Sequence, residues 1–358
     1  MRIAFDVSPL SHERTGVNNY LLGSLRGLAE LAVPLGHELV AFAPTSLRGR
    51  HTISATLSDV PVELRVVPLP ASHAVRAAWS AAGRPSAERW LGPVDVLHFS
   101  DWMYPPQHGG VRATTIHDVV PVRHPEWTTA RTRAMHVRKY RNAAATCDVV
   151  LANSAFTADD FSDAFAFPRE RVHVAPPAVA AEFSAEGEAA DLGRPYILTV
   201  ATLEPRKNLD ALLDAFALLG ETGLLLAVAG GVGWGAQPRL DRPDVVRLGR
   251  VTDQELARLY RGAAAVVYPS LYEGFGMPVI EAMASGAPVV ASSHPSLDEA
   301  SGGAAVRTDP RDPAAIAAAV LDAIDRRDEL RALGLAHAGT FTWRRTGEVF
   351  LEAYTACA

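Results

Sequence analysis

Short apolar segments alternate with longer amphipathic segments along the first half of the chain. Each β-branched or aromatic run is followed by a stretch in which apolar residues recur at helical spacing. The runs are RIAFDV, HELVAFA, VELRVVP, VDVLHFS, ATTIHD, CDVVLANS and RVHVAPP. This alternation predicts a parallel sheet that is covered by helices.

The same alternation returns in the second half, where the apolar runs are YILTVAT, LLLAVAGG, DVVRLG, AAVVYPS and PVVAS. Between the two series, the segment PAVAAEFSAEGEAADLGRP combines proline, glycine and acidic residues without a strong period, which predicts an interdomain linker. We therefore expect two doubly wound α/β domains, over residues 1–178 and 192–342. Ligands of open α/β sheets bind at the carboxyl ends of the strands, so two facing sheets would form a cleft.

Two capping boxes predict helix starts within the second series. Thr252 is followed by Glu255, and Ser296 by Glu299, at the spacing that lets the two side chains satisfy each other's backbone N–H groups.

Composition agrees with two domains and narrows the class of protein. The chain has 358 residues, of which 48% are hydrophobic, enough for two cores. Its net charge of -6 argues against general nucleic-acid binding. The two cysteines, Cys147 and Cys357, suggest no disulfide framework, so we expect a cytoplasmic protein. Asp6 interrupts the N-terminal apolar run, and no run approaches the roughly 20 residues of a spanning helix, so neither a signal peptide nor a membrane span is expected.

The most informative segment is YPSLYEGFGMPVIEAMASGAPVVA, in which two carboxylates flank a glycine loop. Glu273 and Glu281 lie on either side of Gly274, Phe275 and Gly276. The glycines leave backbone N–H groups bare, and such groups can bind an anion or sugar hydroxyls. Alone, the two glutamates could equally be residues that cap or solvate a helix.

Proline and glycine in this segment mark the limits of a helix. Pro278 suits a first turn and Gly286 suits the end, which places Glu281 just inside the helix. The helix N-terminus would then point into the glycine loop, where a phosphate group would be stabilised.

An upstream segment, TLEPRKNLD, carries the basic pair Arg206 and Lys207. Fixed positive side chains of this kind can stabilise the negative charge of a phosphate group. The alternative is an ordinary solvated basic loop before a helix.

Together these segments resemble the retaining glycosyltransferases of family 4, which have the GT-B fold. The resemblance extends to DVSPLSHERTGVNNY and TIHDVVPVRHPEW, so it covers nearly the whole chain, and it suggests the mannosyltransferase-B-like subgroup. It implies two Rossmann-like domains, acceptor-binding and donor-binding, that face a central cleft. It also implies a final helix over residues 343–358 that packs back on the first domain.

The resemblance also assigns roles to single residues. Glu281 would accept hydrogen bonds from the ribose hydroxyls, and Glu273 would hold a hydroxyl of the donor sugar. His117 would contact the transferred sugar near the reacting carbon, although a histidine at a strand end can also be structural. Gly16 would let backbone approach the donor phosphate, or would serve a tight strand-to-helix turn. His117, Lys207 and Glu273 are the expected catalytic residues.

One position departs from the family pattern. Many relatives carry an arginine directly after a glycine at the end of the strand before the basic pair, whereas this chain reads Val200, Ala201 and Thr202. Arg206 and Lys207 are therefore expected to carry more of the interaction with phosphate.

The implied reaction is retaining transfer of a hexose, with mannose from GDP-mannose as the expected donor, onto a saccharide or glycolipid acceptor in polysaccharide biosynthesis. The chain has no Asp-x-Asp pair and no cluster with metal-ligand spacing, so no metal and no cofactor beyond the donor is expected. A sugar-nucleotide epimerase, a phosphorylase, and a non-catalytic protein that binds sugar nucleotides or carbohydrate are the alternatives.

Two further segments bear on ligand binding. A basic stretch could contact an anionic membrane at its inner face or a lipid-diphosphate acceptor, or could simply be an exposed helix face. Its members are Arg131, Arg133, His136, Arg138, Lys139 and Arg141. The glycine-rich AGGVGWG does not have the GxGxxG spacing of a dinucleotide site.

Overall fold

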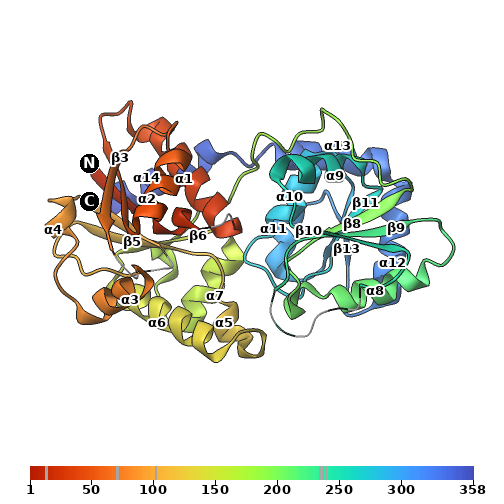
Figure 1. Cartoon of the computed structure of the whole chain (residues 1–358), viewed down its shortest axis with the longest axis horizontal. Coiled ribbons are helices and arrows are strands. Elements are labelled where there is room, and N and C mark those ends of the chain that lie inside the picture. The colour runs from red at the N-terminus through yellow and green to blue at the C-terminus, as the bar shows by residue number, and fades with distance from the viewer. Residues whose placement is uncertain (13–14, 70–71, 101–102, 234, 236–237, 239) are drawn as a thin grey trace. The chain divides into compact units, whose positions relative to one another are not determined.

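The computed structural model describes residues 1–12, 15–69, 72–100, 103–233, 235, 238 and 240–358. It divides the chain into two compact units (Figure 1). The first comprises Met1–Pro177 with Thr342–Ala358, and the second comprises Ala178–Phe341.

The first unit contains a seven-stranded parallel sheet with the order β3-β2-β1-β4-β5-β6-β7. The central strands are buried along their whole length, and two of them also bury polar side chains, among them His98, Arg112 and Thr114. The strands are β1 (Arg2–Asp6), β2 (Glu38–Thr45), β3 (Glu63–Pro68), β4 (Val96–Phe99), β5 (Val111–Ile116), β6 (Val149–Ala152) and β7 (Val172–Val174). The order reverses between β1 and β4, and such a switch point is where open α/β sheets bind ligands.

Helices connect these strands. They are η1 (Ser8–Ser11), α1 (Gly16–Ala32), α2 (Leu47–Thr56), α3 (Ser72–Ala82), α4 (Glu88–Leu91), α5 (Val120–Arg123), η2 (Pro125–Trp127), α6 (Ala130–Thr146), α7 (Ala155–Phe165) and η3 (Arg169–Arg171). The C-terminal helix α14 (Trp343–Cys357) also belongs to this unit and packs along α1 (Figure 1). Their contact is close because Gly27 and Gly347 face each other, and a Cβ at Gly347 would lie 2.3 Å from the Gly27 carbonyl carbon.

The second unit contains a six-stranded parallel sheet with the order β10-β9-β8-β11-β12-β13. The strands are β8 (Tyr196–Val200), β9 (Leu225–Ala229), β10 (Val245–Gly249), β11 (Ala265–Tyr268), β12 (Val289–Ser292) and β13 (Val306–Thr308). The apolar pattern predicts all of these strands except β13, which has three residues and is only partly buried. The helices are η4 (Pro205–Lys207), α8 (Leu209–Leu218), α9 (Asp253–Gly262), α10 (Met277–Ala284), η5 (Pro295–Leu297), α11 (Asp298–Ser301), α12 (Pro313–Asp325) and α13 (Arg327–Ala338).

The segment expected to be a linker is attached to the second unit. Its Phe183 is 6% exposed, and its ring packs edge-on against Tyr260 at 5.8 Å. Arg261 donates a hydrogen bond to the carbonyl of Glu188 at 2.7 Å. These contacts place residues from Ala178 onward within the second unit, so the segment is not a free linker.

One of the two predicted capping boxes is confirmed and the other is wrong. Thr252 accepts from the Glu255 amide at 3.2 Å, while the Glu255 carboxylate accepts from the Thr252 amide at 2.7 Å. The second helix begins at Asp298 instead, because the Ser296 hydroxyl is engaged elsewhere and accepts from the Glu273 amide at 3.0 Å.

None of the helices among the described residues combines the length and the apolar composition that crossing a membrane requires.

Candidate functional site

The glycine loop between β11 and α10 has the geometry that the sequence predicts. Gly276 caps the helix with a φ of 99°, and Gly286 follows it with a φ of 77°. Both values lie in the left-handed region, which favours glycine. Pro278 lies in the first turn, and Glu281 lies within the helix. The predicted limits of this helix are confirmed.

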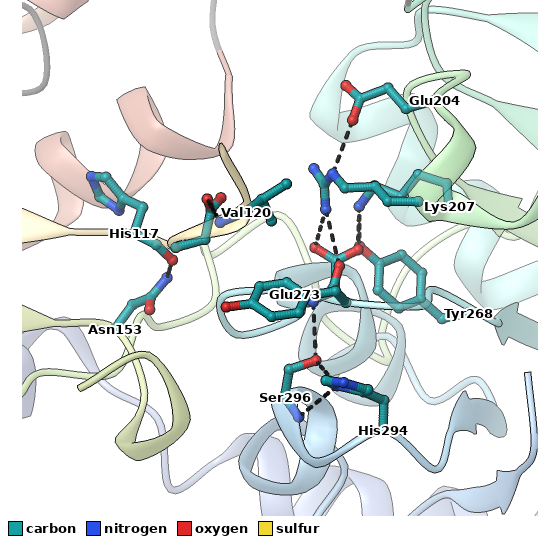
Figure 2. A network of polar contacts seen from close by, with 12 residues as sticks. His117, Val120, Asn153, Glu204, Lys207, Tyr268, Glu273, His294 and Ser296 are labelled. Atoms are coloured by element: carbon teal, nitrogen blue, oxygen red, sulfur yellow. Dashed lines mark hydrogen bonds and ion pairs between the residues drawn. The ribbon is translucent and has the colours of Figure 1, made fainter. Parts of the chain in front are cut away.

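A buried cluster of two cations and a carboxylate lies beside this loop. Arg206 Nη1 donates to Glu273 Oε2 at 2.7 Å, and Lys207 Nζ donates to Glu273 Oε1 at 2.6 Å (Figure 2). The basic pair follows β8 and Glu273 follows β11, and these strands are neighbours at the reversal of strand order. The parallel pairing therefore brings together side chains that lie 66 and 67 positions apart.

Tyr268, at the end of β11, completes this cluster and was not singled out from the sequence. Its hydroxyl accepts from Lys207 Nζ at 2.6 Å and donates to Glu273 Oε1 at 3.0 Å (Figure 2). The ammonium also lies 4.9 Å from the centre of the Tyr268 ring. In the sequence, Tyr268 is indistinguishable from the last apolar residue of a strand. Only its buried position, with 2% exposure, shows that the hydroxyl needs partners.

Outer contacts hold the cluster in place. Glu204 Oε2 accepts from Arg206 Nε at 2.9 Å, so the guanidinium bridges two carboxylates. On the other side, the Ser296 hydroxyl lies 2.9 Å from His294 Nδ1 while it accepts from the Glu273 amide (Figure 2). Neither Ser296 nor His294 stands out in the sequence, because short polar residues after a strand are common in loops.

The charges of Arg206 and Lys207 keep the Glu273 carboxyl ionised. Burial by itself would raise the pKa of Glu273, but the charges of Arg206 and Lys207 outweigh it and lower the pKa to about 2. The pKa of Lys207 is lowered, first by burial and then by the charge of Arg206, while Glu273 opposes this shift. Glu273 is 6% exposed and Lys207 8%, so the basic pair is not a solvated loop.

Glu281 lies apart from this cluster in the contact network. Tyr260 on α9 donates to Glu281 Oε2 at 3.3 Å. The pKa of Glu281 is raised to about 7, mainly by burial and then by the charge of Asp253. The hydrogen bond from Tyr260 lowers the pKa by less than Asp253 raises it. A carboxyl group poised near neutrality is typical of a functional site, and structural groups can share this property.

Phe275 does not present its side chain to a ligand. The ring is 2% exposed and packs edge-on against Phe341 at 5.4 Å, within the core of the second unit. Of the three residues Gly274, Phe275 and Gly276 that were expected to bind the donor, Phe275 can contribute only through its backbone.

In the first unit, His117 follows β5 and is half-buried. Its carbonyl accepts from Asn153 Nδ2 at 2.9 Å (Figure 2), and the Tyr20 ring lies edge-on to the imidazole at 5.1 Å. Asp118 accepts from the Val120 amide at 3.0 Å, so this carboxylate orders the loop backbone. A cavity of about 20 Å³ lies beside His117 and includes Tyr20 in its lining, and this volume is enough for about one water.

Gly16 is the first residue of α1, after the Thr15 cap. It is not among the residues with positive φ, and a Cβ at this position would meet no described atom within 4 Å. Neither a strained turn nor internal packing therefore requires glycine at this position.

The basic segment forms α6, but its cations do not share one environment. Lys139 is 1% exposed and donates to the Thr115 carbonyl at 2.8 Å, which secures the end of β5. His136 lies 3.2 Å from the Tyr140 hydroxyl. The exposed members are Arg131, Arg133, Arg138 and Arg141.

Within the described ranges, no group of three or more His, Cys, Asp or Glu side chains is placed to hold a metal ion. Arg206 and Lys207, both paired with Glu273, follow β8, and Glu273 lies four residues before α10 begins at Met277.

Two α/β units, each with a parallel sheet whose strand order reverses once, are typical of the GT-B fold. Residues 14–183 match the protein family described as "Glycosyltransferase Family 4". Residues 194–326 match the family described as "Glycosyl transferases group 1". Together the two matches cover most of the chain, which belongs to the family-4 glycosyltransferases.

Known proteins agree with this assignment. The chain is 29% identical to O-antigen chain mannosyltransferase B of Escherichia coli, over 99% of each chain. Its fold is similar to that of sucrose-phosphate synthase from Thermosynechococcus elongatus, with a TM-score of 0.73, 17% identity and coverage of 99% and 98%. It is also similar to Anabaena HepE in complex with UDP and glucose, with a TM-score of 0.69, 16% identity and coverage of 99% and 100%.

Proposed function

We propose that this glycosyltransferase moves mannose from GDP-mannose onto a saccharide or glycolipid acceptor, with retention of the anomeric configuration. The observation that carries the proposal is the buried cluster of Arg206, Lys207 and Glu273 beside the glycine loop. The choice of mannose is supported by the full-length similarity to an O-antigen chain mannosyltransferase.

The cations of the cluster would stabilise the leaving diphosphate. Arg206 and Lys207 are held in place before any ligand arrives, so they need little reorganisation when the sugar-phosphate bond breaks. Together with the helix dipole of α10, they would supply the positive charge that a metal ion supplies in other transferases. We therefore propose a reaction that requires no metal.

The remaining residues would position the donor and the sugar. Glu281 would accept from the ribose hydroxyls, and Glu273, which has lone pairs beyond those used by the cations, would also accept from a sugar hydroxyl. Gly16 would allow backbone near the phosphate, and His117 would contact the transferred sugar.

The proposed step breaks the bond between the anomeric carbon and the diphosphate oxygen. The acceptor hydroxyl oxygen forms the new bond on the same face of the sugar, and its proton passes to the departing phosphate oxygen. Lys207 and Arg206 would stabilise the charge that develops on this oxygen.

The donor is tested by thermal unfolding with GDP-, UDP- and dTDP-sugars in the presence of EDTA. A ligand that binds only the folded state raises the melting temperature by mass action. We expect a selective increase with GDP-mannose. A selective increase with another nucleotide sugar would exclude the proposed donor, and no increase with any of them would contradict binding without metal.

The roles of the cluster are tested by variants of the whole chain. Lys207→Ala and Glu273→Ala should each lower turnover by about a hundredfold or more, the scale of losing one charge-stabilising group. Glu188→Ala is the matched control, since that carboxylate is 80% exposed and pairs with Arg258. If both cluster variants turn over as fast as the control, the assigned roles are wrong. Turnover in the presence of EDTA tests whether the reaction requires a metal, and the anomeric configuration of the product tests whether it is retained.

We further propose that the protein is cytoplasmic and contacts the inner face of the membrane through α6. Four exposed arginines and Met135, which is 62% exposed, lie on a helix without acidic residues. Replacement of Arg131 and Arg133 by glutamine should weaken binding to vesicles with anionic phospholipid, whereas replacement of Arg258 should not. Equal binding by both variants would contradict this contact.

A further inference from the structure

The first unit contains an apolar pocket that the proposed reaction does not use. It has a volume of about 300 Å³ and lies between the strands β2 and β3 and the segment that forms α3 and α4. Phe42, Val67, Val75, Trp79 and Trp90 are among its lining residues. It shares no lining residue with the small cavity beside His117.

The walls of this pocket are fixed by packing between aromatic rings. Trp79 is 8% exposed and packs edge-on against Phe42 at 6.3 Å and against Trp90 at 5.1 Å. Its indole N–H donates to the Pro85 carbonyl at 2.6 Å, so this polar group is already satisfied. A polar ligand would lose its hydrogen bonds to water against such walls, whereas a hydrocarbon would lose none.

The volume is suited to a hydrocarbon chain. An apolar cavity of about 150 Å³ can bind benzene, and this pocket has twice that volume. In proportion to benzene, which has six carbons, it would hold a chain of about ten methylene groups.

Charge at the rim indicates the headgroup. Arg84 lines the pocket and is exposed, and it forms no hydrogen bond or ion pair with the described part of the chain. No described lining residue is acidic. A guanidinium pairs favourably with the oxygens of a phosphate.

We propose that this pocket binds the hydrocarbon chain of a single-chain lipid whose phosphate headgroup lies at Arg84. The apolar walls bind the chain by excluding water, and the rim cation selects the anionic end. The proposal does not depend on the transfer reaction, because binding alone is its readout.

Titration calorimetry of the full chain with octyl phosphate and decyl phosphate, each below its micelle concentration, tests the proposal. Each buried methylene strengthens binding about fourfold, so decyl phosphate should bind about fifteenfold more tightly than octyl phosphate. Inorganic phosphate, which has no hydrocarbon chain, should not compete with decyl phosphate. Equal affinity for the two chain lengths, or no binding of either, would overturn the proposal.

Two pairs of variants locate the ligand. Ala78 lines the pocket, whereas Ala77 is an exposed residue of the same helix that does not. Ala78→Trp should fill the pocket and lower the affinity for decyl phosphate at least tenfold, while Ala77→Trp should leave it unchanged. If both variants bind like the wild type, the lipid binds elsewhere and the assignment is wrong.

The headgroup is tested with Arg84→Gln and with Arg89→Gln, an exposed arginine that does not line the pocket. Arg84→Gln should lower the affinity for decyl phosphate about fivefold, which is the scale of one exposed ion pair. The affinity for 1-decanol, which has no charge, should not change. Equal affinity of Arg84→Gln and Arg89→Gln for decyl phosphate would overturn the role of the rim cation. Retention of the wild-type melting temperature confirms that each variant is folded.

Discussion

Glu273 is buried as an anion, which is costly unless opposite charges compensate for it. Arg206 and Lys207 provide that compensation at 2.7 and 2.6 Å. The carboxylate in turn keeps the two cations in fixed positions while no ligand is present. The same contacts that stabilise the folded unit would therefore prepare the cations for a diphosphate.

Tyr268→Phe tests this interpretation at a single hydroxyl. The change removes one of the two acceptors of Lys207 and a donor to Glu273, and hydrogen bonds to charged groups contribute about 1.5–3 kcal/mol. We expect kcat to fall at least tenfold with little change in KM. The matched control is Tyr196→Phe, which removes a buried hydroxyl that donates to the Leu259 carbonyl in the same unit. A smaller loss of kcat for Tyr268→Phe than for the control would contradict a positioning role.

Glu281 predicts a dependence of donor binding on pH. With a pKa raised to about 7, the carboxyl is mostly protonated at pH 6 and mostly ionised at pH 8. If the ionised form accepts from the ribose, the affinity for the nucleotide should rise about tenfold over this range. Calorimetry at both pH values checks this, and Glu281→Gln should remove the dependence. If the affinity of Glu281→Gln for the nucleotide still depended on pH in the same way, another group would be responsible for the dependence.

The same residue predicts a change in stability of defined sign. The folded-state pKa is raised from 4.5 to about 7, so the folded protein binds the proton more tightly and loses stability as the pH rises through that window. The shift corresponds to about 3 kcal/mol once both states are ionised. Glu281→Gln should therefore raise the melting temperature at pH 8 more than at pH 5. Equal changes at the two pH values would show that burial of this charge is not costly.

At the scale of elements, the close packing of α1 against α14 depends on glycine. A Cβ at Gly27 would lie 1.8 Å from the Trp343 carbonyl oxygen, which neither backbone can avoid without moving. Gly27→Ala should lower the free energy of unfolding by several kcal/mol, despite the better helix propensity of alanine. Gly16→Ala is the control on the same helix, because its Cβ would meet no described atom. Denaturant unfolding of both variants checks this, and equal stability would contradict the packing argument.

Gly16→Ala also distinguishes the two interpretations of that glycine. The melting temperature without ligand should not fall, because neither φ nor packing requires glycine there. If the backbone approaches the donor phosphate at this point, the affinity for the nucleotide sugar should fall about tenfold, measured by calorimetry. Unchanged affinity would leave Gly16 without a role in binding.

At the scale of the molecule, the chain does not divide into its two units at a single point. The first unit includes Thr342–Ala358, and its core contains Phe350 and Tyr354, both with 0% exposure. Truncation after Phe341 should therefore destabilise the first unit much more than the second. Calorimetric unfolding should show a transition of the first unit that moves to lower temperature, while a nucleotide still stabilises the second unit. Loss of both transitions together would show that the units unfold as one.

The sequence by itself determined the alternation of strands and helices, because strands buried on both faces of a parallel sheet are rich in apolar residues, and the helices between them have apolar residues at helical spacing. It also determined the limits of α10, because Pro278 and Gly286 restrict the backbone locally. Local chemistry of this kind is visible in a few consecutive residues. It also singled out Glu273, Arg206 and Lys207 as candidates, although it could not show that they touch.

Tertiary structure alone decided the partners of these side chains. Tyr268 belongs to the cluster because β11 pairs with β8, and no local pattern reveals a contact across 61 positions. Ser296 bonds to the Glu273 amide instead of capping a helix, so the local capping signal was overridden by a distant donor. The core position of Phe275 and the burial of Lys139 were decided in the same way. Short-range signals fix the backbone, whereas burial and pairing between distant segments fix which side chains remain available for chemistry.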